Sequence, residues 1–228
     1  MKKAGVLAGL FLAGCATVEP GAVGRVDLFN GKDLAGWTAV VDHDATGGYA
    51  APEPTWAVVD GAIRTTGTPF GYLRTKRTDF ADGKLHVEYR WWRKTEKPNS
   101  GVFVRIGAEH GTFLPTCHEN QLCLGSAGDV LGLAGAPIAG CAAGGAFTPE
   151  KPLSGISRAA KKAESSEKPF GEWNVLEVEL DGDVLVNRVN GVEQNRVKGV
   201  ANRRGAIALQ AEGGAVEFRN AWFEEMKK

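Results

Sequence analysis

Apolar and polar residues alternate in short runs along most of the chain, from residue 26 to residue 223. Apolar side chains at every second position are typical of β-strands that bury one face. Alternating or short apolar runs predict strands at residues 26–29, 56–59, 85–92, 102–106, 176–180, 184–189, 207–211 and 216–223. Pairs of residues that tolerate positive φ predict tight turns between several of them: Asp60-Gly61, Asp181-Gly182, Asn190-Gly191 and Gly213-Gly214. The pattern therefore predicts an all-β fold, a two-sheet antiparallel β-sandwich whose first strand lies close to its last.

Two segments interrupt the strand pattern. Residues 156–165, in a Lys-rich stretch, are the one candidate for a short helix, which we expect at the surface. The glycine-rich residues 125–145 predict a long irregular loop with a short strand at 130–133. No spacing typical of a phosphate-binding loop opens a helix there. Because long loops on a sandwich commonly carry function, this loop is a candidate part of a site.

Alternation also separates the two faces of individual strands. It assigns one set of side chains to the core: Leu85, Val87, Tyr89, Trp91, Val102, Val104 and Ile106. The opposite faces, with the segment 117–124, carry carboxylate, guanidinium, amide, imidazole and aromatic groups: His86, Glu88, Arg90, Trp92, Phe103, Arg105, Glu119 and Gln121. Aromatic rings that pack on sugar C–H groups and planar groups that bind hydroxyls suit a carbohydrate-binding surface. An ordinary solvated sheet face is the alternative.

The first residues predict an exported lipoprotein. Lys2 and Lys3 precede an apolar stretch at 4–13, which is too short to span a bilayer and ends in Leu12-Ala13-Gly14-Cys15. We therefore predict a signal peptide over residues 1–14, a tether over 15–24 that is lipidated at Cys15, and a single domain over 25–228. Several acyl chains would hold the protein at the bacterial cell envelope, on the periplasmic or outer-membrane face. An ordinary secretory signal with a chance cysteine is the alternative.

The charges of the chain are balanced. With 27 basic and 27 acidic residues, the sequence gives no electrostatic case for binding nucleic acid. The class of nucleic-acid-binding proteins is therefore not favoured.

Three cysteines remain once Cys15 carries the lipid. In an oxidising compartment, Cys117, Cys123 and Cys141 can form at most one disulfide and leave one thiol. An extended strand would hold residues 117 and 123 about 20 Å apart, beyond disulfide reach. Cys141 is therefore the expected partner of one of them. A metal site is the alternative, although no CxxC spacing supports it.

A series of short motifs resembles one known family over residues 26–223. The motifs are Leu28-Phe29-Asn30-Gly31-Lys32-Asp33-Leu34, Gly36-Trp37, Trp56 with Asp60-Gly61, Asn99-Ser100-Gly101-Val102-Phe103 with Arg105, Glu119-Asn120-Gln121, Lys168-Pro169, Gly171-Glu172-Trp173-Asn174, Asn190-Gly191, Leu209-Gln210 and Phe218-Arg219-Asn220. The chain resembles the 3-keto-disaccharide hydrolase domain family. The resemblance implies a concanavalin- or laminin-G-like jelly roll, export, and action on 3-keto-glycosides that a partner sugar 3-oxidoreductase makes. The family's usual strand reads Tyr-Glu-x-Gln-Ile, and this chain departs from it with His118 at the aromatic position and the polar Asn120 at a position whose parity is that of the core.

The chemistry that the resemblance implies assigns roles to the polar residues. A ketone at C3 of a sugar acidifies the C2 proton, so a base can remove it and the enolate can expel the C1 group. We predict Glu119 as the base and Arg105 as the group that stabilises the enolate, with a mutual salt bridge as the alternative. The predicted substrate-binding residues are His86, Glu88, Asn99, Gln121 and Gln210.

Several alternatives stay open on the sequence alone. No cofactor is certain, but a divalent cation held by Glu88, Glu119 or His86 is one alternative, because ligands from adjacent strands need no sequence spacing. Asp42-His43-Asp44 is a weaker metal candidate. Arg158, Lys161 and Lys162 form either a lid over an anionic ligand or a solvated face. A non-catalytic carbohydrate-binding module or a passive module of the cell envelope is the alternative to an enzyme.

Replacement of Cys15 by Ser should release the protein from the membrane fraction, because the acyl chains that anchor it would be missing. Cell fractionation with an antibody against the domain measures the change. An unaltered membrane-bound share in the variant would contradict the lipoprotein prediction.

Overall fold

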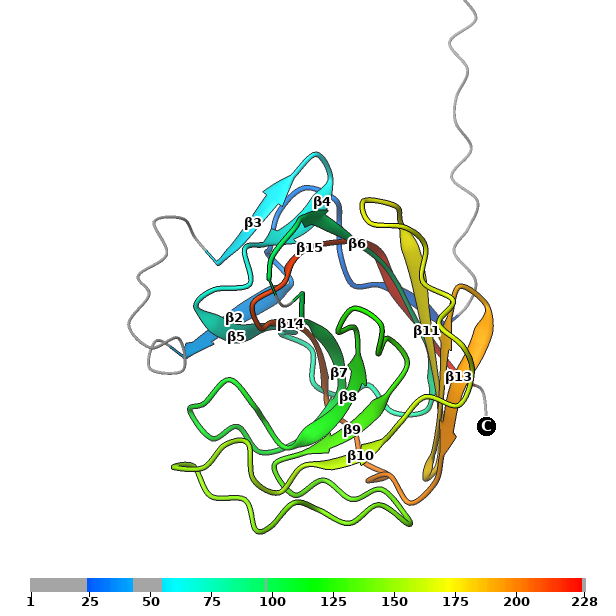
Figure 1. Ribbon diagram of the computed structural model, residues 1–228. Coiled ribbons are helices and arrows are strands. Elements are labelled where there is room, and N and C mark those ends of the chain that lie inside the picture. The colour runs from blue at the N-terminus through cyan, green and yellow to red at the C-terminus, as the bar shows by residue number, and fades with distance from the viewer. Residues whose placement is uncertain (1–23, 43–54, 97, 227–228) are drawn as a thin grey trace, which may run out of the picture.

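The computed structural model describes residues 24–42, 55–96 and 98–226, and these form an all-β fold (Figure 1). The predicted lipidation site Cys15, the signal peptide and residues 15–23 lie outside the described residues, as do His43 and Asp44. Within the described ranges, no helix has the length and apolar character needed to cross a membrane. The candidate helix at 156–165 is wrong, because Ser157–Ala159 is a strand, β10, that pairs with β9 (Val130–Leu133). The predicted strand at 130–133 is confirmed as β9.

Two antiparallel sheets lie against each other as the layers of a sandwich (Figure 1). The eight-stranded sheet has the order β13 (Val192–Val197), β12 (Val184–Val189), β11 (Asn174–Asp181), β6 (Gly83–Arg93), β15 (Ala215–Glu225), β4 (Ala62–Thr65) and β3 (Trp56–Val59), and β1 (Arg25–Asp27) also pairs with β15. The seven-stranded sheet has the order β10, β9, β8 (Cys117–Gln121), β7 (Gly101–Ile106), β14 (Ala206–Ala211), β5 (Phe70–Thr75) and β2 (Trp37–Asp42). The two-sheet antiparallel sandwich predicted from the alternation is confirmed.

The pairing of the first strand with the last and the hairpin turns follow the prediction. Arg25 in β1 lies opposite Glu224 in β15. The β3–β4 hairpin turns through Asp60 and Gly61, with φ of 50° and 75°, and the β12–β13 hairpin turns through Asn190 and Gly191, with φ of 49° and 81°. Two consecutive residues with positive φ match the twist of the paired strands, and Asn, Asp and Gly adopt this conformation at low cost.

One apolar cluster fills the space between the sheets. It receives Leu85, Val87, Tyr89 and Trp91 from β6 of the eight-stranded sheet, and the side chains of Val102, Val104, Ile207 and Leu209 from the seven-stranded sheet. The core face predicted for β6 is therefore confirmed. Burial of these side chains supplies the main driving force for folding, since each contributes roughly 1.5 to 3 kcal/mol.

A direct polar contact joins the two sheets across this apolar layer. Asn120 on β8 is fully buried, and its Nδ2 donates to the Val102 carbonyl at 3.1 Å. Its Oδ1 accepts a hydrogen bond of 2.9 Å from Nδ2 of Asn187 on β12. The polar residue at this core position thus has partners in both sheets, which offsets the cost of burying an amide.

A second apolar cluster covers the outer face of the seven-stranded sheet. Its buried members are Tyr72, Phe103, Ile106, Phe113, Leu114, Cys117, Leu133, Ala206 and Ala208. Phe113 and Leu114 belong to the loop between β7 and β8. This loop lies on the side of the sheet away from the eight-stranded sheet (Figure 1), whereas the long segment between β9 and β10 contributes Ile138 to the cluster between the sheets. The seven-stranded sheet is consequently buried on both faces near its middle, and a polar group there loses contact with water.

The cysteines do not form the expected bridge. Cys117, Cys123 and Cys141 are all free thiols. Cys117 belongs to the apolar cluster on the outer face of the seven-stranded sheet, whereas Cys141 packs against the cluster between the sheets. The sheet therefore separates these two thiols, and the predicted pairing with Cys141 is wrong.

Arg105 lies in a β-bulge, and the bulge reverses the direction of its side chain. Between Ala206 and Ala208, β7 contributes one residue more than β14, and Arg105 has φ of 55°. Its guanidinium is fully buried, with Nη2 2.8 Å from Asp82 Oδ1 and Nη1 donating to the carbonyls of Gly182 and Ala201 at 2.7 and 2.9 Å. The extra residue in a bulge shifts the alternation of all that follow. Ile106 accordingly packs in the outer cluster, and its predicted core position is wrong.

Replacement of Asp82 by Ala should lower the free energy of unfolding by about 3 to 5 kcal/mol, because it leaves the buried Arg105 guanidinium without its counter-ion. Urea denaturation measures this change. The matched control is Asp27→Ala, which removes the partner of Arg25 in an exposed ion pair and should cost at most about 1 kcal/mol. Equal effects of the two substitutions would contradict the structural role of Arg105.

Candidate functional site

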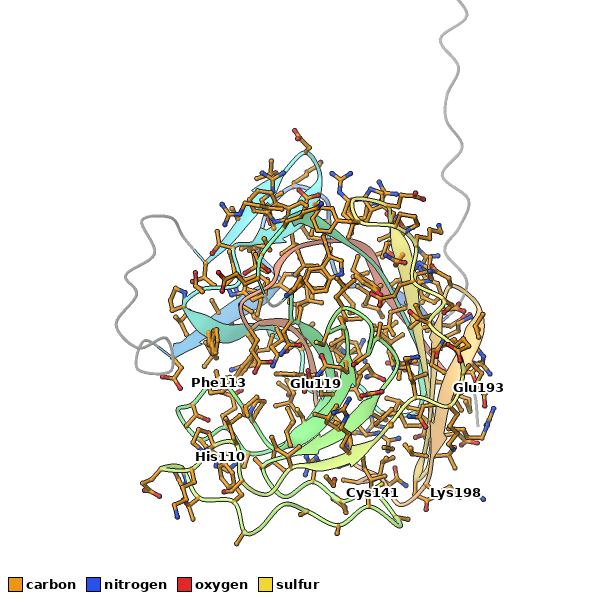
Figure 2. The ribbon with its side chains drawn as sticks, in the orientation of Figure 1. His110, Phe113, Glu119, Cys141, Glu193 and Lys198 are labelled. Atoms are coloured by element: carbon orange, nitrogen blue, oxygen red, sulfur yellow. The ribbon has the colours of Figure 1, made fainter. Side chains whose placement is uncertain are left out.

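Glu119 lies in the middle of the seven-stranded sheet and points to its outer face. It is on β8, opposite Phe103 of β7, and only 2% of it is exposed (Figure 2). Its Oε1 has no hydrogen-bond partner within the part of the chain that the structure describes. A Cβ atom on Gly101 would lie 2.2 Å from this oxygen. The glycine of the Asn99-Ser100-Gly101 motif therefore leaves the space that the Glu119 carboxylate occupies.

A second carboxylate, that of Glu212, lies close to Glu119. Glu212 directly follows β14, and its Oε2 accepts a hydrogen bond of 2.7 Å from Asn99 Nδ2. The Asn99 carbonyl in turn accepts from the Gly214 amide at 2.9 Å, which ties the β14–β15 turn to the segment before β7. Asn99 thus positions the Glu212 side chain beside Glu119.

The surroundings disfavour ionisation of both carboxyl groups. Burial raises the pKa of Glu212 to about 7, although the nearby Gln210 amide opposes the shift. Burial and then the charge of Glu212 raise the pKa of Glu119 well above its usual value. Two neighbouring carboxylates in a dry site cannot both carry a charge at low cost. At neutral pH the pair therefore contains a protonated Glu119 beside a Glu212 that readily exchanges its proton.

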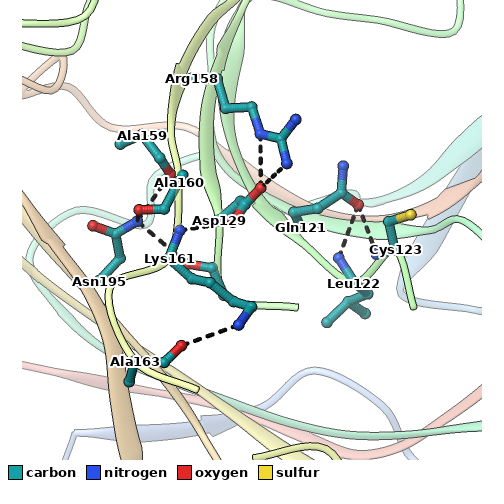
Figure 3. Close-up of polar contacts among 11 residues, drawn as sticks. Gln121, Leu122, Cys123, Asp129, Arg158, Ala159, Ala160, Lys161, Ala163 and Asn195 are labelled. Carbon is teal, nitrogen blue, oxygen red and sulfur yellow. Dashed lines mark hydrogen bonds and ion pairs between the residues drawn. The ribbon is translucent and has the colours of Figure 1, made fainter. Parts of the chain in front are cut away.

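Two predicted amides lie on the same outer face as Glu119. Gln121 follows it on β8, and its Oε1 accepts from the backbone amides of Leu122 and Cys123 at 2.9 and 2.8 Å (Figure 3). Gln210 on β14 is fully buried, and Ser100 Oγ donates to its carbonyl at 2.8 Å. The structure therefore brings together four residues predicted from the sequence: Asn99, Glu119, Gln121 and Gln210.

A cavity of about 640 Å³ opens beside the carboxylate pair. Glu212, Phe70 and Asp42 line it from the sheet, and Phe113 and the segment 149–154 line it from the loops. The Asp42 carboxylate accepts a hydrogen bond from the Phe113 amide at 3.2 Å, and the rings of Phe70 and Phe113 are 5.4 Å apart. The volume lies within the range of about 300 to 1,000 Å³ that is usual for small-molecule sites.

Three predicted site residues do not belong to this site. Arg105 points into the sandwich toward Asp82, so the prediction that it shares a surface with Glu119 is wrong. Glu88 and His86 lie on β6, in the other sheet and on its outer face, where Glu88 binds Arg219 and Asn220 and His86 stacks on Trp222. The sandwich separates both from Glu119. The predicted common surface of the three strands is therefore wrong.

Because of this separation, Glu119 cannot share one cation with Glu88 or His86, the residues that the sequence left open as alternative ligands. Among the residues that the structure describes, no three His, Cys, Asp or Glu side chains are arranged to hold a metal ion. Of the Asp42-His43-Asp44 triplet, only Asp42 is described.

The basic residues near β10 have structural partners. Arg158 Nε donates to Asp129 Oδ2 at 2.7 Å, and the Lys161 amide donates to the other oxygen of this buried carboxylate at 2.7 Å (Figure 3). Asn195 of the eight-stranded sheet donates to the carbonyls of Ala159 and Ala160 at 2.9 and 3.1 Å. These bonds hold the segment after β10 across the edge of the sandwich. Arg158 is exposed, as the solvated-face alternative expects, and it also forms an ion pair with a buried carboxylate.

Glu212 was missed by the sequence reasoning. It has the same parity as Gln210, two positions before it, but it lies just past the predicted strand and next to a glycine turn. Extending the alternation by one residue would have placed it on the polar face.

Comparisons with known proteins agree with this architecture. The sequence profile of the 3-keto-alpha-glucoside-1,2-lyase-like domain matches residues 24–224. Among curated proteins, none matches the chain in sequence.

Similar solved structures include a candidate glycosyl hydrolase from Parabacteroides distasonis, with a TM-score of 0.60 and 17% identity over 90% of this chain and 95% of that one. They also include the β-glucanase of Bacillus licheniformis, with a TM-score of 0.56 and 11% identity over 90% and 99%. A carbohydrate-binding module, CBM66 from Bacillus subtilis, has a TM-score of 0.55 and 10% identity over 83% and 96%. At these identities the likeness shows the fold, a concanavalin-like jelly roll.

Replacement of Glu119 by Gln should stabilise the protein at neutral pH and change little at pH 4. Because the folded-state pKa values of Glu119 and Glu212 are raised, the folded protein binds more protons than the unfolded one, and stability falls as pH rises above about 4.5. We expect a gain on the order of 1 to 3 kcal/mol at pH 8. Urea denaturation at several pH values measures it. A variant that is less stable than the wild type at pH 8 would contradict the assignment.

Proposed function

Because the chain belongs to the family of 3-keto-alpha-glucoside-1,2-lyase-like domains, we propose that it cleaves 3-keto-glycosides by removing the C2 proton and expelling the C1 substituent. The observation that carries the proposal is the pair of neighbouring carboxyl groups of the buried Glu119 and the half-buried Glu212, the second of which lines a cavity. Pairs of carboxyl groups whose pKa values are raised by their surroundings are typical of acid–base catalysis.

Glu212 is the general base in this proposal, in place of Glu119. Its pKa of about 7 matches the pH at which proton transfer is most efficient, and it lines the cavity directly. It takes the C2 proton of the sugar, and the electron pair of the C–H bond enters the enolate formed with the C3 ketone. The hydrogen bond from Asn99 to Oε2 orients the carboxylate and leaves Oε1 to accept the proton.

Glu119 is the general acid. Burial keeps its pKa well above the usual value, so that at neutral pH it holds a proton. The enolate collapses to a C1=C2 double bond conjugated with the C3 ketone, and the C1–O bond breaks. Glu119 donates its proton to the departing oxygen, which leaves as an alcohol. Addition of water to the unsaturated product completes a hydrolysis and returns the two carboxyl groups to their starting protonation.

The carbohydrate class of the ligand is supported independently of these roles. The family is named for a glucoside lyase, and the jelly-roll fold is shared with glycan-degrading enzymes and with a carbohydrate-binding module. The cavity is lined by two aromatic side chains, Phe70 and Phe113, and by three carboxylates, Asp42, Glu150 and Glu212, which suit the apolar and hydroxyl faces of a sugar ring.

Replacement of Glu212 by Gln should lower turnover of a 3-keto-glucoside by about 10² to 10⁴, because the isosteric amide cannot accept the C2 proton. The change is measured as kcat/KM on the full chain, with product followed by chromatography. For the wild type we expect kcat/KM to rise with pH up to about 7, as Glu212 loses its proton, and to fall at higher pH where Glu119 loses its own. Glu119→Gln should lower turnover and remove the fall.

The matched control is Glu88→Gln, which changes a carboxylate on the outer face of the other sheet and should leave turnover unchanged. Wild-type turnover by Glu212→Gln would overturn its role as base. Absence of turnover in the wild type, with divalent cations supplied and sugar binding retained, would favour the carbohydrate-binding module.

A further inference from the structure

Next to the carboxylate pair lies a pair of side chains whose polar groups have no hydrogen-bond partner. Tyr72 on β5 and Gln210 on β14 are directly opposite each other in the seven-stranded sheet. Both are fully buried. Within the described part of the chain, Tyr72 Oη and both amide atoms of Gln210 lack hydrogen bonds. Orphaned polar groups of this kind cost about 1 to 3 kcal/mol each, so they need an explanation.

Among the residues that the structure describes, a second pair of buried polar side chains makes a useful contrast. Asn187 and Asn195 also lie opposite each other, and each has an oxygen without a partner. Each nevertheless uses its amide nitrogen in a hydrogen bond, Asn187 to Asn120 and Asn195 to Ala159. In Tyr72 and Gln210, by contrast, no polar side-chain atom makes a hydrogen bond of good geometry, although the Gln210 amide lies near the Glu212 carboxylate, which lines the cavity.

The positions of Tyr72 and Gln210 in the sheet place them close to the cavity that Glu212 lines. Phe70 and Glu212, which line the cavity, lie two positions from Tyr72 and Gln210 on the same two strands and therefore on the same face. The Gln210 amide is close enough to Glu212 to oppose the rise of its pKa. Phe113 belongs to both the cavity wall and the apolar cluster around Tyr72. Tyr72 and Gln210 therefore adjoin residues of the cavity wall, and contact with a ligand in the cavity requires that wall, including the Phe113 ring, to open.

We propose that Tyr72 and Gln210 form the oxyanion site for the C3 oxygen of a 3-keto sugar, with Tyr72 Oη and Gln210 Nε2 as the two donors. This inference rests on the proposed function and names the groups that hold the enolate, a role that Arg105 cannot fill from inside the sandwich. Donors already in place and shielded from water stabilise a developing negative charge strongly, because they need no reorganisation during the reaction. The phenol suits this role, since burial raises the pKa of Tyr72 and it stays a donor at all working pH values.

The test compares Tyr72→Phe with Tyr89→Phe, two buried tyrosines that differ in their partners. Tyr89 lies on β6 in the other sheet, and its hydroxyl donates to Glu167 Oε1 at 3.1 Å. The Tyr72 hydroxyl has no hydrogen-bond partner to lose. Loss of Tyr72 Oη should leave the melting temperature unchanged or higher, and loss of Tyr89 Oη should lower it. A Tyr72→Phe protein that is destabilised like Tyr89→Phe would mean an ordinary structural hydroxyl and would overturn the proposal.

The decisive measurement is the infrared band of a 3-keto-glucoside labelled with ¹³C at C3, bound to full-length Glu212→Gln protein, which should not turn it over. Donors on the ketone lower its stretching frequency, so adding Tyr72→Phe should shift the band upward and adding Tyr89→Phe should not. In the active protein, Tyr72→Phe should lower kcat by about 10² to 10³ with little change in KM, since the bond strengthens as the enolate forms.

The outcomes separate this inference from the proposed function. An upward shift without any wild-type turnover would support the oxyanion site and overturn the proposed reaction. Wild-type turnover with an unshifted band and an unchanged kcat in Tyr72→Phe would overturn the oxyanion site and leave the reaction standing. Gln210→Met in the same background should shift the band in the same direction, and no shift would remove Gln210 from the site.

Discussion

Burial of the Glu119 carboxyl group between apolar layers is costly, and the arrangement around it follows from that cost. The cluster between the sheets lies behind β8, and the loops that carry Phe113 and Leu114 cover its outer face. A carboxyl group in this position is stable only when protonated, unless a cation or several donors accompany it. Oε1 has no such partner among the described residues, so the site keeps its proton. Burial also raises the pKa of Glu212, which lines the cavity, to about 7.

The two sheets have different outer faces, which explains why the proposed site lies on only one of them. On the eight-stranded sheet, arginines stack on the rings of Trp92, Trp173 and Trp222 and bind the carboxylates of Glu88 and Glu217. Arginines cover these rings, and the charges are paired close to solvent. On the seven-stranded sheet, loops exclude water and leave polar atoms without partners. Electrostatic interactions are strong enough for the proposed catalysis only on this outer face of the seven-stranded sheet, where water is excluded.

The sequence predicted the strands and their faces better than it predicted which faces meet. Alternation correctly placed four side chains of β6 in the core, namely Leu85, Val87, Tyr89 and Trp91. It also correctly placed His86 and Glu88 on the opposite face. It could not say that β6 and β8 belong to different sheets, because both sheets bury one face against the same core. Arg105 was misplaced because a single inserted residue in a bulge leaves no mark in the alternation. Tyr72 was missed because β5 is buried on both sides and shows no period of two.

The amide contact between Asn120 and Asn187 has a consequence for how the layers are aligned. Apolar side chains that meet across a sandwich constrain sliding of one layer over the other only weakly, because dispersion contacts depend little on direction. A hydrogen bond between the layers does depend on direction, and it therefore fixes the position of one sheet relative to the other. Glu119 directly precedes Asn120 and points to the opposite face of the sheet, so this hydrogen bond in the core also fixes the position of the buried Glu119 carboxyl group.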